Sequence, residues 1–399
     1  MLIHEYLDQQ IEFEKKYGKN TIILMQVGSF FEFYGVNNKN EKIGNPERIT
    51  ELLNIQLTRR NKAILENSRN NALMAGFPTH SLKKFIEILL SSQYTIILIE
   101  QVTPPPNPKR EVTQIYSPGT YIDNLINYNP NNIVCLYINE EVCYKTHKKI
   151  YIFGLSAIDL STGNNYLYEQ SFGYYDKNAY YEEIYRFIEI FNPKEIVISF
   201  DGELDVKLLK QKINIENRLV HYINCENKYK QNQYQNNFLK KIFNNGNNHD
   251  NNNNKLSVIE FLELERKPNV LVSYLLLLDF SHEHNEQIIR KIKKPEFWNY
   301  DKQLILYHNA LYQLNVVSAH NNENHKYKSL FHILDKTSTP MGKRYFKYIL
   351  HNPYTNINEI NKNYNLIEEF IEKNMLNICE TLLNEIIDIE RLHRKMSIE

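Results

Sequence analysis

Apolar residues recur with two different periods along the first 120 residues of the chain. Helical spacing of three to four residues predicts amphipathic helices over residues 2–17, 49–57 and 81–90, with Ser81 as the N-cap of the last. Runs rich in β-branched residues predict strands over residues 21–27, 94–99 and 112–116. The turn Ser117-Pro118-Gly119-Thr120 follows the last strand and closes a first α/β unit.

A second α/β pattern begins near Ile133. Two β runs, residues 150–160 and 166–168, flank the hairpin signal Ser161-Thr162-Gly163-Asn164. A helical period over residues 182–191 is followed by the apolar run 195–199, which is typical of a buried parallel strand. This alternation predicts a small α/β domain on a mixed sheet.

The rest of the chain is mostly helical in pattern. The Asn-rich tract 244–254 has low complexity and predicts a flexible connection before this region. Pro340 is expected at the first position of one helix. Further helices are predicted over residues 258–265, 270–280, 358–373 and 376–387, and the helical rhythm continues through residues 388–394. We therefore expect the chain to be truncated at Glu399, within this helical region.

Composition narrows the class of protein. Apolar residues make up 42% of the 399 residues, which predicts a folded chain of two to four domains. The 47 basic and 47 acidic residues cancel, which argues against a purely electrostatic nucleic-acid binder but allows local basic patches. Four scattered cysteines without a C-x-x-C pair fit neither a disulfide framework nor a zinc ribbon and predict a reduced, intracellular compartment. No membrane association is expected, because the longest apolar stretch, 270–278, is too short to cross a bilayer.

The segment Gly28-Ser29-Phe30-Phe31-Glu32-Phe33-Tyr34 combines a glycine, four aromatic residues and one acid directly after the first predicted strand. Phe30 and Glu32 are two residues apart, so on a strand they point to the same face. An exposed aromatic wedge beside a carboxylate suits a surface that separates stacked bases and binds the displaced one. A core strand with one satisfied edge acid fits the same seven residues.

Six basic residues in the first unit could contact DNA phosphates. They are Arg59, Arg60, Lys62, Arg69, Lys109 and Arg110. Phosphate contacts of this kind would set the register of the protein on DNA without reading its sequence. A solvated face that binds nothing is the alternative interpretation.

Several segments, in order, resemble motifs of the MutS family of DNA mismatch-recognition proteins. They are Gly28-Ser29-Phe30-Phe31-Glu32, Leu53-Asn54-Ile55-Gln56-Leu57-Thr58-Arg59-Arg60, Met74-Ala75-Gly76-Phe77-Pro78-Thr79-His80, Glu100-Gln101, Ser117-Pro118-Gly119-Thr120, Asp159-Leu160-Ser161-Thr162-Gly163, the stretch 330–344 with Thr339-Pro340-Met341-Gly342, and Asp388-Ile389-Glu390-Arg391. The resemblance spans nearly the whole chain, and the order of the motifs makes it specific. Ser29 replaces the aspartate that is common in bacterial members.

The resemblance implies a multidomain α/β plus α fold. It implies a mixed α/β mismatch-binding domain over residues 1–128, an RNase H-like connector domain over 129–250 and a helical core or lever region over 251–399. By the same resemblance, Phe30 stacks at a mispair and Glu32 hydrogen-bonds the displaced base, while Phe31, Phe33 and Tyr34 pack in the core. The expected partners are double-stranded DNA with mispairs or small loops, a second subunit in a homo- or heterodimer, and downstream mismatch-repair factors.

The family's ATPase is not expected within these 399 residues, because no G-x-x-x-x-G-K-[ST] motif occurs in them. We therefore expect no catalytic residue, cofactor or metal site in this chain, and ATP with Mg²⁺ only in a longer parent protein. Two alternatives remain open. A MutS relative could bind branched or other non-B DNA, although such branches tend to lack the Phe-x-Glu pair. A metal-dependent nuclease centred on Asp159 would need further acids nearby.

Overall fold

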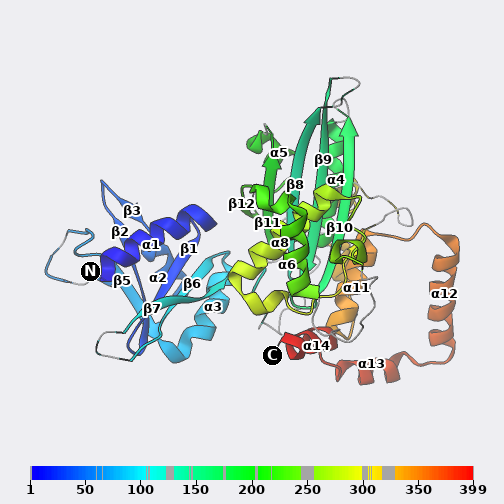
Figure 1. Ribbon diagram of the computed structural model, residues 1–399. Coiled ribbons are helices and arrows are strands. Elements are labelled where there is room, and N and C mark those ends of the chain that lie inside the picture. Colours follow the sequence, from blue (N-terminus) through cyan, green and yellow to red (C-terminus); the bar gives the residue numbers. More distant parts are fainter. Residues whose placement is uncertain are drawn as a thin grey trace, which may run out of the picture. The chain divides into compact units, whose positions relative to one another are not determined.

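The computed structural model describes residues 2–398, apart from residues 60, 65, 105, 107, 123–129, 143, 145–146, 174–176, 203–204, 217, 244–255, 299–303, 305, 307 and 317–328. The chain forms two compact units (Figure 1), of which the first comprises residues 1–124 and 280–288 and the second comprises residues 125–279 and 289–399. Both expected domain boundaries, after residues 128 and 250, lie outside the described residues and stay predictions. Among the described helices, none has the length and apolar character needed to cross a membrane.

The first unit is built on a mixed sheet with the strand order β4-β5-β2-β1-β6-β7, and β3 pairs with β2 beside this path. Its strands are β1 (Thr21–Val27), β2 (Phe30–Asn37), β3 (Lys42–Ile43), β4 (Thr58–Arg59), β5 (Leu73–Pro78), β6 (Thr95–Gln101) and β7 (Arg110–Tyr116). β1 runs antiparallel to β2 and parallel to β6. This pairing places β2, which carries the aromatic segment, between β1 and β5 in the sheet.

Helices cover both faces of this sheet. They are α1 (Leu2–Tyr17), α2 (Pro46–Leu53), η1 (Thr79–Ser81) and α3 (Leu82–Ser91). Tyr6 of α1 packs against Tyr34 on one face of β2. On the other face, Phe31 packs against Phe77, which in turn contacts Phe85 of α3. The hydrophobic core of the unit therefore consists of two layers, one on each side of the sheet.

Most of the predicted elements of the first unit are present, but the bounds of one helix are wrong and one strand was missed. The helix predicted over 49–57 is α2, which begins at Pro46 with Asn45 as its cap and ends where Asn54 takes a left-handed conformation (φ 51°). Ser81 is the N-cap residue of α3, as predicted, although its side chain makes no capping hydrogen bond. The sequence patterns also missed β5, the strand that pairs with β2.

The second unit contains a mixed sheet with the order β12-β11-β8-β9-β10-β13. Its strands are β8 (Asn132–Val142), β9 (Lys149–Asp159), β10 (Asn164–Gly173), β11 (Glu195–Asp201), β12 (Leu219–Tyr222) and β13 (Glu296–Phe297). The predicted hairpin around Ser161-Thr162-Gly163 connects β9 and β10, and the predicted parallel strand is β11, which pairs with β8. Both predictions are confirmed, because the turn residues and the unbroken apolar run are local signals.

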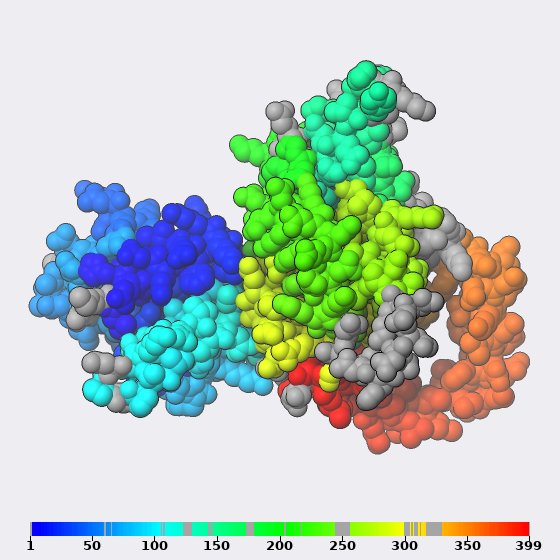
Figure 2. Space-filling view, in the orientation of Figure 1, coloured from blue at the N-terminus to red at the C-terminus, as the bar shows by residue number. Residues whose placement is uncertain are grey.

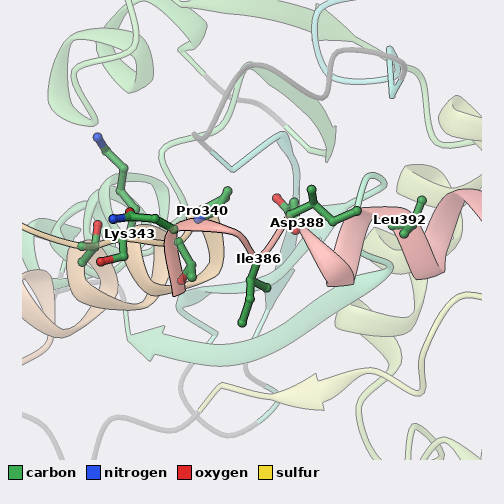
Figure 3. Close-up of a pocket in the computed structure, with 10 residues that line it drawn as sticks. Pro340, Lys343, Ile386, Asp388 and Leu392 are labelled. Carbon is green, nitrogen blue, oxygen red and sulfur yellow. The ribbon is translucent and has the colours of Figure 1, made fainter. Parts of the chain in front are cut away.

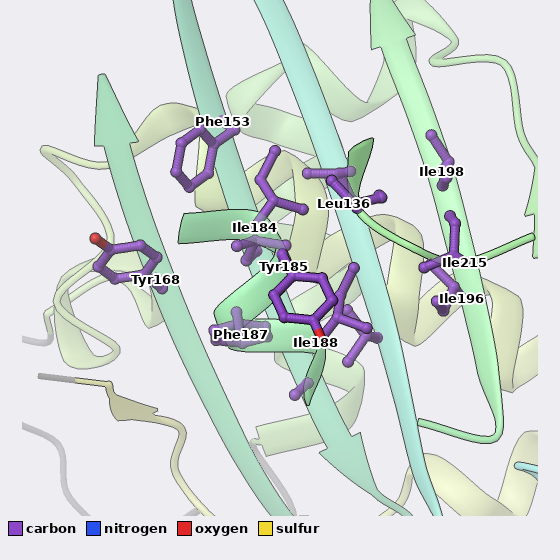
Figure 4. Packing of buried hydrophobic residues seen from close by; sticks show 14 of the residues in the cluster. Leu136, Phe153, Tyr168, Ile184, Tyr185, Phe187, Ile188, Ile196, Ile198 and Ile215 are labelled. Atoms are coloured by element: carbon purple, nitrogen blue, oxygen red, sulfur yellow. The ribbon is translucent and has the colours of Figure 1, made fainter. Parts of the chain in front are cut away.

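Helices also cover both faces of the second sheet. The helices between residues 177 and 289 are α4 (Lys177–Phe191), α5 (Val206–Lys212), η3 (Asn227–Lys230), α6 (Asn232–Phe243), α7 (Val258–Phe261), α8 (Pro268–His284) and η4 (Glu286–Ile289). A core cluster on one face combines Leu136 and Phe153 of the sheet with Ile184 and Phe187 of α4 (Figure 4). On the opposite face, Ser273 of α8 donates a hydrogen bond to the backbone oxygen of Cys135.

The C-terminal part of the second unit is helical, as the sequence predicts. Its helices are α9 (His308–Gln313), α10 (Leu330–Leu334), α11 (Pro340–His351), α12 (Ile357–Glu372), α13 (Leu376–Asn384) and α14 (Ile389–Ile398). Pro340 lies in the first turn of α11, where its missing N–H costs no hydrogen bond, and Thr339 caps the helix by accepting from Gly342 N at 3.0 Å. Neither α12 nor α13, which are orange to red in Figure 2, buries a residue. Apolar side chains of these helices are exposed, Ile378 among them.

Candidate nucleic-acid interface

Phe30 stands at the tip of a tight hairpin between β1 and β2. Val27 and Phe30 pair across the hairpin, so Gly28 and Ser29 alone form the turn. Gly28 has φ +62°, while Ser29 is not among the residues with positive φ, which is the pattern of a type II′ turn with glycine at its first central position. The glycine therefore permits the sharp reversal that brings Phe30 to the start of β2.

Three further contacts hold this hairpin in place. Thr79 N donates to Ser29 O at 2.9 Å, which ties the turn to η1. Gln101 N donates to the side-chain oxygen of Gln26 at 3.0 Å. Arg110 Nε donates to the backbone oxygen of Gln26 at 2.9 Å. The neighbouring strands and η1 therefore support the hairpin from both sides of its turn.

Phe30 and Glu32 lie on one face of β2, as the two-residue spacing predicts. Phe30 is 45% exposed and Glu32 is half-buried, whereas Phe31 and Phe33 on the opposite face are at most 2% exposed. The burial of Phe31 and Phe33 agrees with the predicted packing role of these two residues. Phe30 is thus an aromatic ring at the first position of β2 that is open to solvent, beside a carboxylate on the same face.

The Glu32 carboxylate is bound from within the protein by Tyr34. The Tyr34 hydroxyl donates a hydrogen bond to Glu32 Oε2, and Tyr34 itself is buried, as the predicted packing role requires. Gly76 of β5 lies directly across from Glu32 in the ladder. The sequence interpretation missed both of these neighbours of Glu32, although the same-face spacing of Glu32 and Tyr34 was a signal that could have revealed the first.

Arg69 is engaged by two carboxylates. Its guanidinium donates to Glu41 at 2.6 and 2.8 Å and to Asp8 at 2.7 Å. The hydrogen bond from Arg69, aided by its charge, lowers the pKa of the Glu41 carboxyl. This network cross-links α1 to the segment after β2, so a structural role accounts for Arg69, and its predicted phosphate contact stays a prediction.

The other basic residues have different environments. Lys109 forms an ion pair with Glu111, and Arg110 supports the hairpin through Gln26. Arg59 is half-buried in β4 and Lys62 is exposed in the turn that follows. Arg60 lies outside the described residues. Phosphate contacts by these residues therefore stay predictions, and the role of Arg110 at the hairpin is a feature that sequence spacing did not reveal.

Asp159 has a structural explanation at the β9–β10 turn. Its Oδ1 accepts hydrogen bonds from Ser161 N at 2.9 Å and Ser161 Oγ at 2.5 Å, an arrangement that aspartate commonly makes in turns. Within the described ranges, no group of three or more His, Cys, Asp or Glu residues could hold a metal ion. The geometry therefore gives no support to the nuclease alternative.

A pocket of about 520 Å³ lies beside the start of α11 (Figure 3). Its two labelled charged residues are already paired. Lys343 pairs with Asp335 at 2.8 Å, and Asp388 pairs with Arg344 at 2.5 Å. Burial raises the pKa of the Asp388 carboxyl, but the hydrogen bonds and charge of Arg344 outweigh it, so the net pKa is lowered. The first pair links α11 to the end of α10 and the second links α11 to the start of α14, which accounts for the charges without a ligand.

Comparisons with known proteins identify similar sequences. The chain matches a model of MutS domain I over residues 6–125 and a model of MutS domain III over residues 309–399. A mutS homolog of Acanthamoeba polyphaga mimivirus, named as a DNA mismatch repair protein, is 34% identical, and the match covers 98% of this chain and 37% of that protein. The DNA mismatch repair proteins MutS of Halothermothrix orenii and Caldanaerobacter subterraneus are 27% and 28% identical over 98% and 99% of this chain, and the matches cover 39% and 41% of those proteins. The chain thus spans about two fifths of the length of these relatives.

Proposed function

The chain belongs to the MutS family, and from this premise we propose that its first unit recognises mispaired or looped double-stranded DNA. The observation that carries the proposal is the half-exposed Phe30 ring at the rigid β1–β2 hairpin, with Glu32 beside it on the same face. Phe30 acts as the wedge that stacks at the mispair, and Glu32 accepts a hydrogen bond from the displaced base. The similarity to domain I covers both residues.

The physical basis of recognition is the lower cost of deforming a defective site. A mispaired or looped site loses less stacking and pairing energy when it is kinked than intact duplex does. Stacking of a base on an aromatic face contributes about 1–3 kcal/mol and tolerates any base. Glu32 is repelled by phosphates, so it favours sites at which a base offers a donor in compensation. Phe30 thus supplies binding energy, and Glu32 adds discrimination.

Substitution of Phe30 tests the proposal directly. In the complete protein that contains this sequence, Phe30→Ala is expected to reduce the preference for a mispaired over a matched duplex by roughly 5- to 150-fold, the equivalent of about 1–3 kcal/mol of stacking. Phe30→Tyr is the matched control, because it keeps an aromatic face. Affinity for matched duplex and its salt dependence are expected to change little, since phosphate contacts dominate both.

Electrophoretic mobility shifts with the two duplexes provide the measurement. Because Phe30 is 45% exposed, its truncation has little effect on folding, and thermal unfolding of the variant checks this. An unchanged preference in Phe30→Ala would refute the wedge assignment. If the protein instead binds branched DNA, which is the alternative function, the unsubstituted protein is expected to show only a small preference for the mispaired duplex.

The remaining regions have proposed roles in the same process. The second sheet forms an RNase H-like connector domain, and the helices beyond residue 256 form part of a core or lever that transmits DNA kinking to an ATPase in the parent protein. We expect no ATP hydrolysis by these 399 residues, and ATP with Mg²⁺ to act elsewhere in the parent. Dimerisation, with one wedge at the mispair, and contacts with downstream repair factors belong to the same proposal. An ATPase assay of this chain tests the expectation that these residues hydrolyse no ATP, and turnover that co-purifies with the chain would contradict it.

A further inference from the structure

A buried tyrosine lies directly behind the Glu32 carboxylate. Phe30, Glu32 and Tyr34 alternate along one face of β2, and their exposure falls from a half-exposed ring to a buried one. The Tyr34 hydroxyl donates its hydrogen bond to Glu32 Oε2. That bond engages Oε2, while the lone pairs of the second carboxylate oxygen, Oε1, can accept from another donor.

The neighbours of Glu32 on the two adjacent strands carry no side-chain hydrogen-bond donor. Met25 of β1 and Gly76 of β5 lie directly across from Glu32. The diagonal neighbours on the same two strands are Ile23, Val27, Met74 and Pro78. All of these residues have apolar side chains or none, so among them and Tyr34 only Tyr34 carries a strong side-chain donor.

Gly76 provides the space in which the Glu32 side chain lies. A Cβ atom at position 76 would be 3.1 Å from Glu32 Cγ and 2.8 Å from the Phe31 backbone oxygen. Ordinary carbon contacts are about 3.5–4.0 Å. A side chain at this position would therefore displace Glu32 or separate β2 from β5.

The ring of Tyr34 is held in place by its packing against α1. It packs edge-on against the ring of Tyr6 in α1, with centroids 5.0 Å apart. The Tyr6 hydroxyl is used separately, donating to the Ile23 backbone oxygen at 2.8 Å. Two tyrosines thus lie in contact, but only one of their hydroxyls reaches the carboxylate.

We propose that Tyr34 is a positioning residue that orients the Glu32 carboxylate for the displaced base, a role that rests on the proposed function. A free glutamate side chain samples several rotamers, and ordering it on binding DNA costs free energy. The hydrogen bond from Tyr34 restricts Glu32 before DNA arrives. Tyr34 therefore raises the preference for mispairs without touching DNA.

Tyr34→Phe is the substitution that tests this role. It removes the hydroxyl and keeps the ring that packs on Tyr6. We expect the ratio of mispaired to matched affinity to fall by about 2- to 10-fold, which corresponds to ordering one side chain at an interface. Tyr6→Phe is the matched control, because it removes a buried hydroxyl from the adjacent ring without removing a partner of Glu32, and its ratio is expected to be unchanged.

A double substitution separates positioning from a general structural effect. If Tyr34 acts through Glu32, adding Tyr34→Phe to Glu32→Ala leaves the affinity ratio of Glu32→Ala unchanged. The measurement is binding of mispaired and matched duplexes to the complete protein that contains this sequence. Thermal unfolding of each variant verifies that the proteins remain folded.

The outcomes distinguish this inference from the proposed function. If Phe30→Ala loses the mispair preference but Tyr34→Phe keeps it, the wedge is correct and the role of Tyr34 is refuted. A further loss in the double variant relative to Glu32→Ala also refutes it, because Tyr34 would then act through another contact. If the unsubstituted protein shows no preference, or Phe30→Ala keeps it, the proposed function fails and this inference fails with it.

Discussion

Substitution of Gly154 by alanine tests how closely α8 packs on the second sheet. Gly154 lies in β9, and a Cβ atom there would be 2.5 Å from the Asn269 carbonyl carbon and 2.5 Å from Val270 N, with the Asn269 oxygen closer still. All three are backbone atoms in the first turn of α8. Ordinary contact requires roughly 3.5 Å, so the helix would have to move by about 1 Å. The φ of Gly154 is not positive, so the cost comes from space alone.

Movement of α8 would also strain the hydrogen bonds that hold it. Val270 N donates to Glu169 Oε2 at 2.7 Å. Ser273 Oγ lies 2.8 Å from Ser156 Oγ and donates to the Cys135 oxygen at 2.9 Å. Overpacking of a close-packed interior costs about 1–3 kcal/mol, and each weakened hydrogen bond adds about 0.5–1.5 kcal/mol. We expect Gly154→Ala to lower the free energy of unfolding of the second unit by about 3–5 kcal/mol.

Urea unfolding followed by tryptophan fluorescence measures this loss. Trp298 is the single tryptophan of the chain, is 6% exposed, and packs on Phe187 of α4 in the second unit. Ser273→Ala is the control, because it removes the hydroxyl contacts of α8 without adding volume and should cost about 1–2 kcal/mol. If the free energy of unfolding of Gly154→Ala is within about 0.5 kcal/mol of that of the unsubstituted protein, α8 does not approach β9 as closely as described.

Two further substitutions test the charged networks. Arg69→Met should lower the free energy of unfolding by no more than about 1 kcal/mol for each partly exposed ion pair with Asp8 and Glu41. If the slope of log DNA affinity against log salt concentration instead falls by about one in this variant, Arg69 contacts a phosphate. The pKa of Asp388 is lowered in the folded protein, so its pairing with Arg344 stabilises the fold above the unfolded pKa of about 4 and is lost as the pH falls through the folded value. Urea unfolding should therefore show Asp388→Asn less stable than the unsubstituted protein at pH 6, with a difference that narrows below about pH 4; a constant difference would contradict this pKa shift.

The elements that local patterns specify could be predicted. Helix α1 and strand β1 have the predicted bounds, because apolar periodicity reports which face of an element is buried. The β9–β10 hairpin and the position of Pro340 in α11 follow from turn and cap residues. The predicted end of α2 was wrong because a left-handed Asn54 stops the helix before the apolar pattern ends. Strand β5 was missed because its apolar and small residues carry only a weak strand signal.

For the candidate site, the sequence by itself determined that Phe30 and Glu32 share a face. This follows from the two-residue period of any strand, whatever pairs with it. The ordered motifs also specified the family, which the comparisons confirm. The same alternation places Phe31 and Phe33 on the opposite face of the strand from Phe30.

Only the tertiary structure decided what surrounds these two residues. Pairing of β2 with β5 brings Gly76 across from Glu32, and pairing of β6 with β7 brings Arg110 to the Gln26 carbonyl. The partners in each case are far apart in the chain, and strand order and register are set by burial of the whole sheet rather than by local sequence. The sequence therefore specified which side chains could meet DNA, and the fold decided how firmly they are held.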